Sequence, residues 1–428
     1  MTELFSANVL YLNVTEDYTN WAGFKITFKE AIDVQLLQEV VRRSFRRYPY
    51  FSEKVVFDGN KYVLVTNDKP FVVYTDKDGP LDILGPGNNY YQIRMTVSDN
   101  ILDARFFHGL TDGRGFSKFI KSVLYEYFSI LNADAPDVPG VVLLDSKITD
   151  DELGDPFLNR DVPAQQDREQ DNKAQKDQKD AKLFRLPLTE QADGNTYSFQ
   201  IRMDEQQFMK YSRNVDGSPN AVIALLMARA ILSEHPEASD EIVAGVAMDE
   251  RTALERPESH LSSITLILLR YKKKMETMPL TTQATCFRGM IIAGSDPDKV
   301  RSGFPKSIGF YNMLNSIPSF ADRKKLASMI VSARANEDTF HVSYIERSCF
   351  GELEQYIESL YSIVEVKGNS MMIEINSLKG SFFINIMQGF SSDRYVRAMI
   401  RQIEQEGMSC TIDKSEVLAP MSNDLVML

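Results

Sequence analysis

The spacing of apolar residues alternates between helical and strand-like periods in the first part of the chain. In residues 32–47, apolar side chains recur every three or four positions and basic residues gather in the last turn, which predicts an amphipathic helix ended by Tyr48-Pro49. Residues 54–57 and 61–66 are β-rich and flank Asp58-Gly59-Asn60, so they predict a hairpin with a glycine turn.

A second predicted hairpin leads directly into a helix. Residues 90–97 and 101–107 alternate apolar and polar side chains, and residues 115–128 return to a helical period. This arrangement places His108 at the end of a strand, facing the loop that precedes the helix.

The second half of the chain repeats this mixture of strands and helices. Ser218 and Pro219 open a predicted helix that continues to residue 232, with Ser218 as its N-cap. Further patterns predict strands at 196–203, 242–248, 263–271, 339–345, 370–375 and 381–387, and helices at 205–212, 321–336 and 393–406.

A polar stretch at residues 161–182 separates the two halves. Its only large apolar residue is Val162, so it cannot repay by burial the entropy lost on ordering. A coil and a solvated, charged helix both fit its composition. We expect two α/β domains, at residues 1–160 and 188–428, joined by a crossover linker at 161–187. Because hairpins recur, each domain is expected to hold a mixed, largely antiparallel sheet with flanking helices.

Composition and charge exclude several classes of protein. The 428 residues are 43% hydrophobic and 25% charged, which is ordinary for a globular chain of about two domains. With 48 Lys and Arg against 60 Asp and Glu, the net charge is −12, so the chain has no basic footprint for nucleic acid.

Cysteine usage and the apolar runs bear on the compartment. The three cysteines, Cys286, Cys349 and Cys410, form no C-x-x-C pair, which favours a reducing environment over a disulfide framework. The first residues lack a basic stretch leading into an apolar one, and the apolar run at 221–232 is shorter than a membrane span. We expect a soluble, cytoplasmic protein without a transmembrane segment.

Most motifs that carry chemistry are missing. The sequence has no P-loop, no dinucleotide-binding glycine pattern and no G-x-S-x-G. Its four histidines, His108, His235, His260 and His341, show no metal-ligand spacing, so no metal is expected.

What remains is an H-x-x-x-D-G motif formed by His108, Asp112 and Gly113. A neutral imidazole at a strand end can take a proton from an alcohol or amine as it attacks an acyl carbon. Asp112 can anchor the loop through a buried ion pair or amide hydrogen bonds, and Gly113 can permit a turn closed to other residues. A strand-terminal histidine followed by an aspartate N-cap also occurs in proteins without such activity.

The motif and its surroundings resemble the CoA-dependent acyltransferase superfamily, which includes chloramphenicol acetyltransferase, alcohol acetyltransferases and peptide-synthetase condensation domains. Arg47-Tyr48-Pro49-Tyr50-Phe51 looks like the family's turn into a hairpin, and residues 106–116 match its strand, motif loop and helix. Residues 218–232, 245–251 and 380–388 are similar to its later helix and strands.

The resemblance implies two chloramphenicol acetyltransferase-like domains with a tunnel between them. It implies that His108 is the general base and that Asp112 turns away to pair with an arginine, for which Arg251 matches and Arg114 competes. Acyl-CoA would be a co-substrate, with no permanently bound cofactor.

The chain also departs from its relatives. The D-F-G-W-G segment of the plant enzymes is absent, Phe107 stands where several relatives carry a second histidine, and Glu346 follows a strand that tends to continue into glycine. Ser343 is the candidate donor for an oxyanion, or a strand residue facing a neighbour. The basic run Lys272, Lys273 and Lys274 could meet CoA phosphates, or be a solvated strand end.

The sequence thus predicts an acyltransferase that moves an acyl group, such as acetyl, from a thioester to a hydroxyl or amine. Two alternatives stay open. The donor could be bound to an acyl carrier protein, as in condensation enzymes, or the chain could be a non-catalytic binding member of the same fold.

Overall fold

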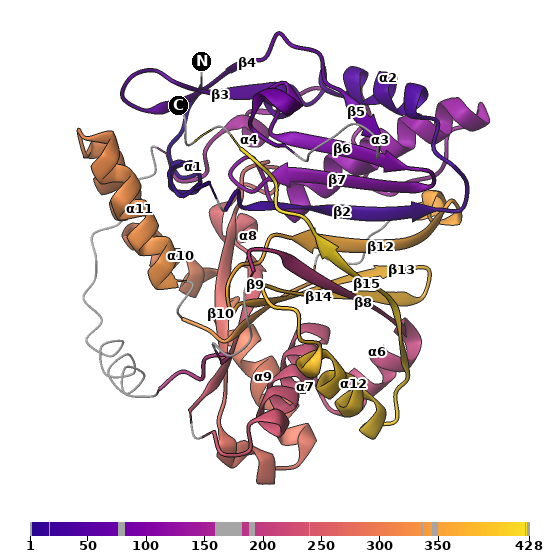
Figure 1. Cartoon of the computed structure of the whole chain (residues 1–428), viewed down its shortest axis with the longest axis vertical. Coiled ribbons are helices and arrows are strands. Elements are labelled where there is room, and N and C mark those ends of the chain that lie inside the picture. The colour runs from indigo at the N-terminus through magenta and orange to yellow at the C-terminus, as the bar shows by residue number, and fades with distance from the viewer. Residues whose placement is uncertain are drawn as a thin grey trace.

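The computed structural model describes residues 2–16, 18–75, 82–158, 182–187, 193–238, 240–334, 337–344, 350–423 and 425. Three sheets organise them: one of five strands, one of seven, and a small one of three near the first residues (Figure 1). The small sheet has the order β1 (Thr2–Glu3), β4 (Tyr62–Thr66), β3 (Glu53–Phe57).

The five-stranded sheet carries the predicted motif at the end of a central strand. Its order is β12 (Ile357–Val364), β2 (Trp21–Phe28), β7 (Ile101–Phe107), β6 (Ile93–Ser98), β5 (Val73–Thr75). All neighbours are antiparallel except β5 and β6. Helices α2 (Val34–Ser44) and α3 (Gly113–Asn132) cover one face of this sheet and bury the core between them.

The seven-stranded sheet is mixed. Its order is β10 (Ile264–Tyr271), β9 (Ile242–Asp249), β11 (Phe340–Tyr344), β13 (Met371–Leu378), β14 (Ser381–Gln388), β8 (Thr196–Asp204), β15 (Cys410–Leu418). Only β11 runs parallel to its neighbours, β9 and β13. Both large sheets are therefore mixed and largely antiparallel, which confirms the predicted fold class.

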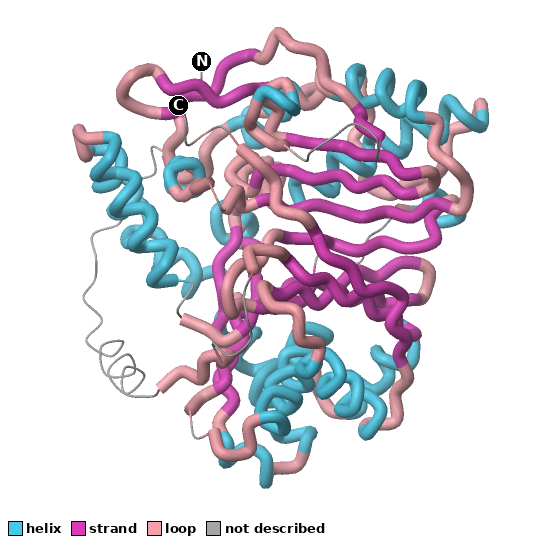
Figure 2. The backbone as a smooth tube through the Cα atoms, viewed as in Figure 1, coloured by secondary structure: helices cyan, strands magenta, loops and turns pink. Residues whose placement is uncertain are grey.

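Helices cover the far face of the seven-stranded sheet and one side of the molecule (Figure 2). The covering helices are α6 (Glu205–Asn214), α7 (Pro219–Glu234), α9 (Leu280–Gly294) and α12 (Arg394–Gln405). At the side lie α10 (Pro297–Ser316) and α11 (Phe320–Arg334), while α1 (Asn8–Leu12), α4 (Asp150–Leu153) and α8 (Arg251–Leu254) are short. Single 3-10 turns lie at Pro49–Ser52, Pro86–Asn88, Lys273–Thr277 and Gly351–Gln355.

One strand joins the two halves of the chain. β12 comes late in the sequence, yet it pairs with β2 from Ile357 opposite Phe28 to Val364 opposite Ala22 (Figure 1). The division of the chain at the linker stays a prediction, and the sheets do not follow it at β12. Of the linker predicted at 161–187, residues up to 181 lie outside the described residues, while Leu183 forms a bridge with Glu241 just before β9.

Among the described residues, no single helix has the length and apolar composition to cross a membrane. α6 and α7 meet that test only as a pair bent by 83°.

Candidate active site

His108 and Asp112 lie in the short loop between β7 and α3. Two glycines in and after this loop are required by close packing: a Cβ on Gly115 would lie 2.2 Å from Thr111 Oγ1, and one on Gly109 would lie 2.3 Å from the Phe107 ring. Gly113 was expected to allow a turn closed to other residues, but this is wrong. Gly113 is the first residue of α3 and is absent from the glycines with positive φ. Glycine is therefore required at Gly109 and Gly115, where a Cβ would not fit, rather than at Gly113.

The Asp112 carboxylate is fully buried, and both of its oxygens form hydrogen bonds and ion pairs with other groups of the protein. Oδ1 accepts from the backbone N–H of Gly115, 3.0 Å away, and so caps α3. Oδ2 accepts from the backbone N–H of Ser263 at 3.1 Å. Arg251 Nη2 lies 3.0 Å from Oδ1 and 2.9 Å from Oδ2. The ion pair predicted between Asp112 and Arg251 is therefore present, together with the amide bonds and the helix cap.

Arg251 is 2% exposed and ties the motif loop to the segment after β9. Its Nε donates to the carbonyl of Ser259 at 2.9 Å, and its Nη2 donates to that of Leu261 at 2.9 Å. Its Nη1 lies 3.2 Å from Asp249 Oδ1. Burial alone would lower the pKa of Arg251, but the charges of Asp112 and Asp249 raise it, so the guanidinium stays charged.

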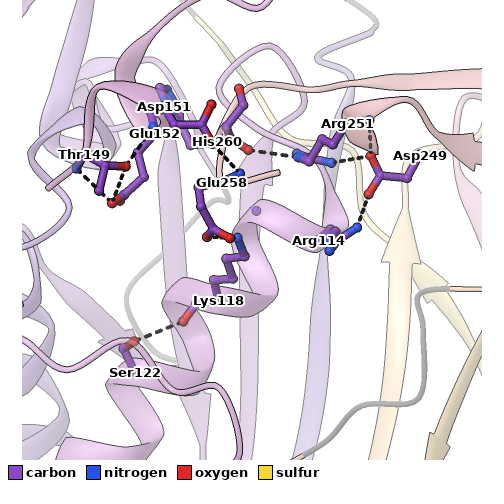
Figure 3. Close-up of polar contacts among 12 residues, drawn as sticks. Arg114, Lys118, Ser122, Thr149, Asp151, Glu152, Asp249, Arg251, Glu258 and His260 are labelled. Atoms are coloured by element: carbon purple, nitrogen blue, oxygen red, sulfur yellow. Dashed lines mark hydrogen bonds and ion pairs between the residues drawn. The ribbon is translucent and has the colours of Figure 1, made fainter. Parts of the chain in front are cut away.

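Arg114, the competing partner of Asp112, pairs with Asp249 instead. Figure 3 shows Arg251 and Arg114 directed at the same Asp249 carboxylate from two sides. We call Asp112, Arg251, Asp249 and Arg114 the Arg251 cluster. It joins the first turn of α3 to the end of β9, and thereby joins the two large sheets at the motif.

His108 is half-buried, and its backbone N–H donates to the carbonyl of Asn20 at 2.9 Å. Burial lowers the pKa of the imidazole below its ordinary 6.5, although the charge of Asp112 and the backbone of His108 itself raise it. The ring is therefore neutral at neutral pH, and a neutral imidazole has one unprotonated nitrogen that can act as a base.

A second set of residues, which the sequence pattern does not connect with the motif, supports the loop from the other side. Thr111 Oγ1 donates to the carbonyl of His260 at 2.6 Å. The His260 ring stacks on Tyr50 with centroids 4.0 Å apart, and burial lowers its pKa to about 4. The turn at Arg47 also contributes, since this arginine forms two hydrogen bonds, of 2.7 and 2.9 Å, with the buried carboxylate of Glu152.

Ser343 lies at the end of the seven-stranded sheet nearest the motif loop. Val342 of β11 is in register with Val246 of β9, so strand spacing places the Ser343 Cα about 8 Å from that of Asp249. On its other side Ser343 is in register with Glu374 of β13. No described contact joins Ser343 to His108, so its role stays a prediction.

Glu374 is 4% exposed, and its Oε2 has no hydrogen-bond partner among the described residues. Burial raises its pKa to about 8, and the neighbouring Ser343 opposes that rise. The carboxyl is therefore mostly protonated at neutral pH. The sequence pattern of β13 gives no sign of this group, because it stands where an apolar strand residue would be expected.

The basic run lies away from the motif. Ile264, at the start of β10, is in register with Asp249, and Tyr271, at its other end, is in register with Ile242. The end at Tyr271 therefore lies ~23 Å along the strand from Asp249, and Lys272 follows it. Lys272 Nζ lies 2.7 Å from Glu241 Oε1, and Lys273 donates to the carbonyl of Pro236. Lys274 is exposed. Binding of CoA phosphates by these lysines stays a prediction.

In the part of the chain that the structure describes, no three His, Cys, Asp or Glu side chains are grouped so that they could hold a metal ion.

Comparison with known proteins places the fold. No family model matches the chain, and no curated protein matches it. Polyketide synthase associated protein 5 from Mycobacterium tuberculosis matches with a TM-score of 0.62 and 13% identity over 93% of this chain and 95% of that one. The trichothecene 15-O-acetyltransferase TRI3 from Fusarium sporotrichioides gives 0.60 and 11%, covering 94% of this chain and 93% of that one.

Two further structures extend the comparison. TRI101 from F. sporotrichioides, complexed with coenzyme A and T-2, matches with a TM-score of 0.58 and 13% identity over 98% of this chain and all of that one. The nonribosomal peptide synthetase FmoA3 gives 0.59 and 14% over 90% of this chain but 42% of its own, longer chain. The chain thus has the two-domain fold of the acetyltransferase TRI3 and of TRI101, which a segment of a peptide synthetase shares.

Proposed function

We propose that this chain is an acyltransferase that moves an acyl group from acyl-CoA to the hydroxyl or amine of a small acceptor. The observation that carries the proposal is the setting of His108: a neutral, half-buried imidazole at the end of β7, while the neighbouring Asp112 is fully engaged by Arg251 and two amides. The fold shared with two acetyltransferases supports it.

In the proposed reaction His108 acts as general base and then as general acid. The free ring nitrogen takes the proton from the acceptor O–H or N–H as the oxygen or nitrogen forms a bond to the thioester carbonyl carbon. The tetrahedral intermediate then collapses, the C–S bond breaks, and the imidazolium returns the proton to the leaving thiolate. Asp112 does not touch the reacting atoms; it holds the loop in which His108 sits.

Ser343 and Glu374 are the proposed oxyanion side of the site. Because Glu374 keeps its proton up to about pH 8, it can donate to Ser343 Oγ, which leaves the Ser343 O–H to donate to the oxyanion. Loss of such a donor costs about 3–4 kcal/mol of transition-state stabilisation, so Ser343→Ala should lower kcat strongly. Unchanged turnover in Ser343→Ala would remove it from the mechanism.

The test is thiol release from acetyl-CoA and longer acyl-CoAs with a panel of alcohols and amines. His108→Ala should lower acceptor-dependent release by about 10²–10⁴-fold. His235→Ala is the matched control, because His235 lies at the end of α7 and contacts Tyr395 rather than the motif loop. Equal loss in both variants, or no loss in His108→Ala, would contradict the proposed base.

The pH profile gives a second readout. With acyl-CoA and a reactive acceptor, kcat/KM should rise with pH through a value below 6.5, as His108 loses its proton, and fall again near pH 8, as Glu374 ionises. In Glu374→Gln the fall near pH 8 should disappear while the rise persists.

A carrier-bound acyl donor is the second candidate. The match to a peptide synthetase favours it, and so does the basic run, where Lys272 and Lys273 are already engaged far from the motif. Acyl transfer from an acylated carrier protein but not from acyl-CoA, still dependent on His108, would support this donor over CoA.

A further inference from the structure

Four side chains on neighbouring strands of the five-stranded sheet form a stacked row on the face turned away from α2 and α3. In strand order they are Trp21 on β2, Arg105 on β7, Arg94 on β6 and Tyr74 on β5. The Arg105 guanidinium lies 4.2 Å from the Trp21 ring centroid, and that of Arg94 lies 3.9 Å from the Tyr74 centroid. Arg94 and Arg105 are direct cross-strand partners. We call this row the arginine ladder.

The two arginines of the ladder differ in charge balance. Arg105 forms two hydrogen bonds of 2.8 Å with Asp103, one to each carboxylate oxygen. Arg94 is only 2% exposed and makes no ion pair with any carboxylate of the described residues. The ladder therefore carries one buried positive charge that its own side chains leave uncompensated.

The nearest candidate to compensate it, Asp82, is directed elsewhere. Its Oδ2 accepts from the backbone N–H of Gly87 at 2.6 Å. A Cβ on Gly85 or Gly87 would come within 2.5 and 2.7 Å of the Asp82 carboxylate, so these two glycines enclose it. The charges of Asp82 and Asp103 raise the pKa of Arg94 against the effect of burial, but neither carboxylate forms an ion pair with it.

The unmet hydrogen-bonding capacity of the ladder consists of donors alone. Among the described residues, Arg94 Nε and Nη1, Arg105 Nη1 and Trp21 Nε1 are buried and have no partner. A guanidinium cannot shed its proton in a protein, so burial cannot be relieved by neutralisation. An unpaired buried donor is costly, and more so when it is charged.

We propose that the arginine ladder binds an oxyanion, a phosphate or a carboxylate, at the buried, unpaired N–H groups of Arg94 and Arg105. A water molecule can accept only two hydrogen bonds and brings no charge. A phosphate or carboxylate offers at least four lone pairs on two or more oxygens, and guanidinium N–H groups pair with such oxygens in parallel. Tyr74 is only half-buried, so the Arg94 end of the ladder is the end nearest solvent.

The oxyanion could be a free ion or part of a larger molecule such as coenzyme A, and the experiment separates these. Calorimetric titration uses inorganic phosphate, acetate and coenzyme A, at matched ionic strength, against the full chain. At least one of the oxyanions should bind once per chain, and Arg94→Met should weaken that binding about 10-fold or more. Arg94→Lys, which keeps the positive charge but loses the planar set of N–H donors of the guanidinium, should bind with intermediate affinity. Arg42→Met, which removes an exposed arginine on α2, is the matched control and should bind as the wild type does.

Thermal unfolding separates a ligand site from a structural stack. Without the oxyanion, Arg94→Met should unfold at the same temperature as the wild type or higher, because it removes an uncompensated buried charge. With the oxyanion in excess, the wild type should gain stability and Arg94→Met should not, so the order of the two proteins reverses. A purely structural ladder would instead make Arg94→Met less stable under both conditions, and that result would overturn the proposal.

The titrations also show which molecule supplies the bound oxyanion. Coenzyme A that displaces phosphate and depends on Arg94 would support a phosphate group of the acyl donor as the ligand; this reading alone rests on the proposed function. Phosphate or acetate that binds in the presence of saturating coenzyme A would support a free ion or another molecule. Absence of Arg94-dependent binding for all three probes would overturn the proposal, whatever the enzyme assay shows.

Discussion

Arg251 and Arg94 are both 2% exposed, yet their surroundings are opposite. Arg251 meets two carboxylates and two backbone carbonyls, so its donors are paired around the guanidinium. Arg94 stacks on Tyr74 and leaves Nε and Nη1 without a partner among the described residues. Among the described residues, Arg251 thus has a partner for its charge and Arg94 has none.

The difference separates two uses of a buried charge. A charge paired by residues far apart in the sequence holds those residues together, and removing it leaves a carboxylate buried alone. A charge left unpaired costs stability until a ligand supplies the partner. The Arg251 cluster therefore should be required for folding, whereas the arginine ladder should be required for binding.

The largest expected effect is that of Arg251→Met. This substitution removes the positive partner of the fully buried Asp112 carboxylate, which then keeps only its hydrogen bonds with the backbone amides of Gly115 and Ser263. The free energy of unfolding should fall by about 3–5 kcal/mol, measured in urea at neutral pH. Arg94→Met, a matched loss of a buried arginine, should cost nothing in the absence of an oxyanion. Retention of stability and activity in Arg251→Met would remove Arg251 from the scheme.

A smaller effect on the free energy of unfolding is expected from Glu374, a buried carboxyl that, like Arg94, has a polar atom without a partner among the described residues. Its pKa of about 8 lies above the 4.5 of an unfolded glutamate, so between these values the folded chain binds one proton more. Stability due to this group therefore falls as pH rises, by about 1.4 kcal/mol per pH unit, and the loss ends above about pH 8.

One neighbour shares the range from pH 7 to 8 with this group. The pKa of His341 is lowered by burial to about 4, so this residue has titrated below that range, whereas Asp338, whose pKa is raised by burial to about 7, still loses part of its proton within it. Denaturant unfolding at several pH values should therefore show a steeper fall from pH 7 to 8 in the wild type than in Glu374→Gln. Glu358→Gln, which alters an exposed carboxyl on β12, should keep the wild-type slope.

Local patterns were sufficient to predict most elements near the motif. The hairpin of β6 and β7, the helix α3 and the strands β8, β9, β13 and β14 lie close to their predicted ranges, because each has a clear period of two or near 3.6. Ser218 caps α7 in position, although its side chain makes no capping bond. α9 and α10 were missed, since their apolar positions follow no clear stripe and Pro305 lies inside α10.

The site was predictable only as far as its motif. His108, Asp112 and the pairing with Arg251 follow from residues 108–113 and a family resemblance. Two further partners come from distant segments: Ser263 lies 151 residues from Asp112, whose carboxylate it contacts, and Asp249 lies 135 residues from Arg114. No local pattern marks them, and the same holds for the arginine ladder, which exists only because β2, β7, β6 and β5 are neighbours.

The smallest expected effect sharpens the comparison within the Arg251 cluster itself. Arg114 pairs with Asp249, but its side chain is 45% exposed and the pair is open to solvent. Arg114→Gln should therefore change the free energy of unfolding by less than about 1 kcal/mol, and the change should shrink further as salt screens the pair. Asp249 keeps Arg251 as a partner in this variant, so the motif loop should stay in place and acyl transfer should persist. If Arg114→Gln instead destabilised the chain as much as Arg251→Met, the pairing of Asp112 would have been assigned to the wrong arginine.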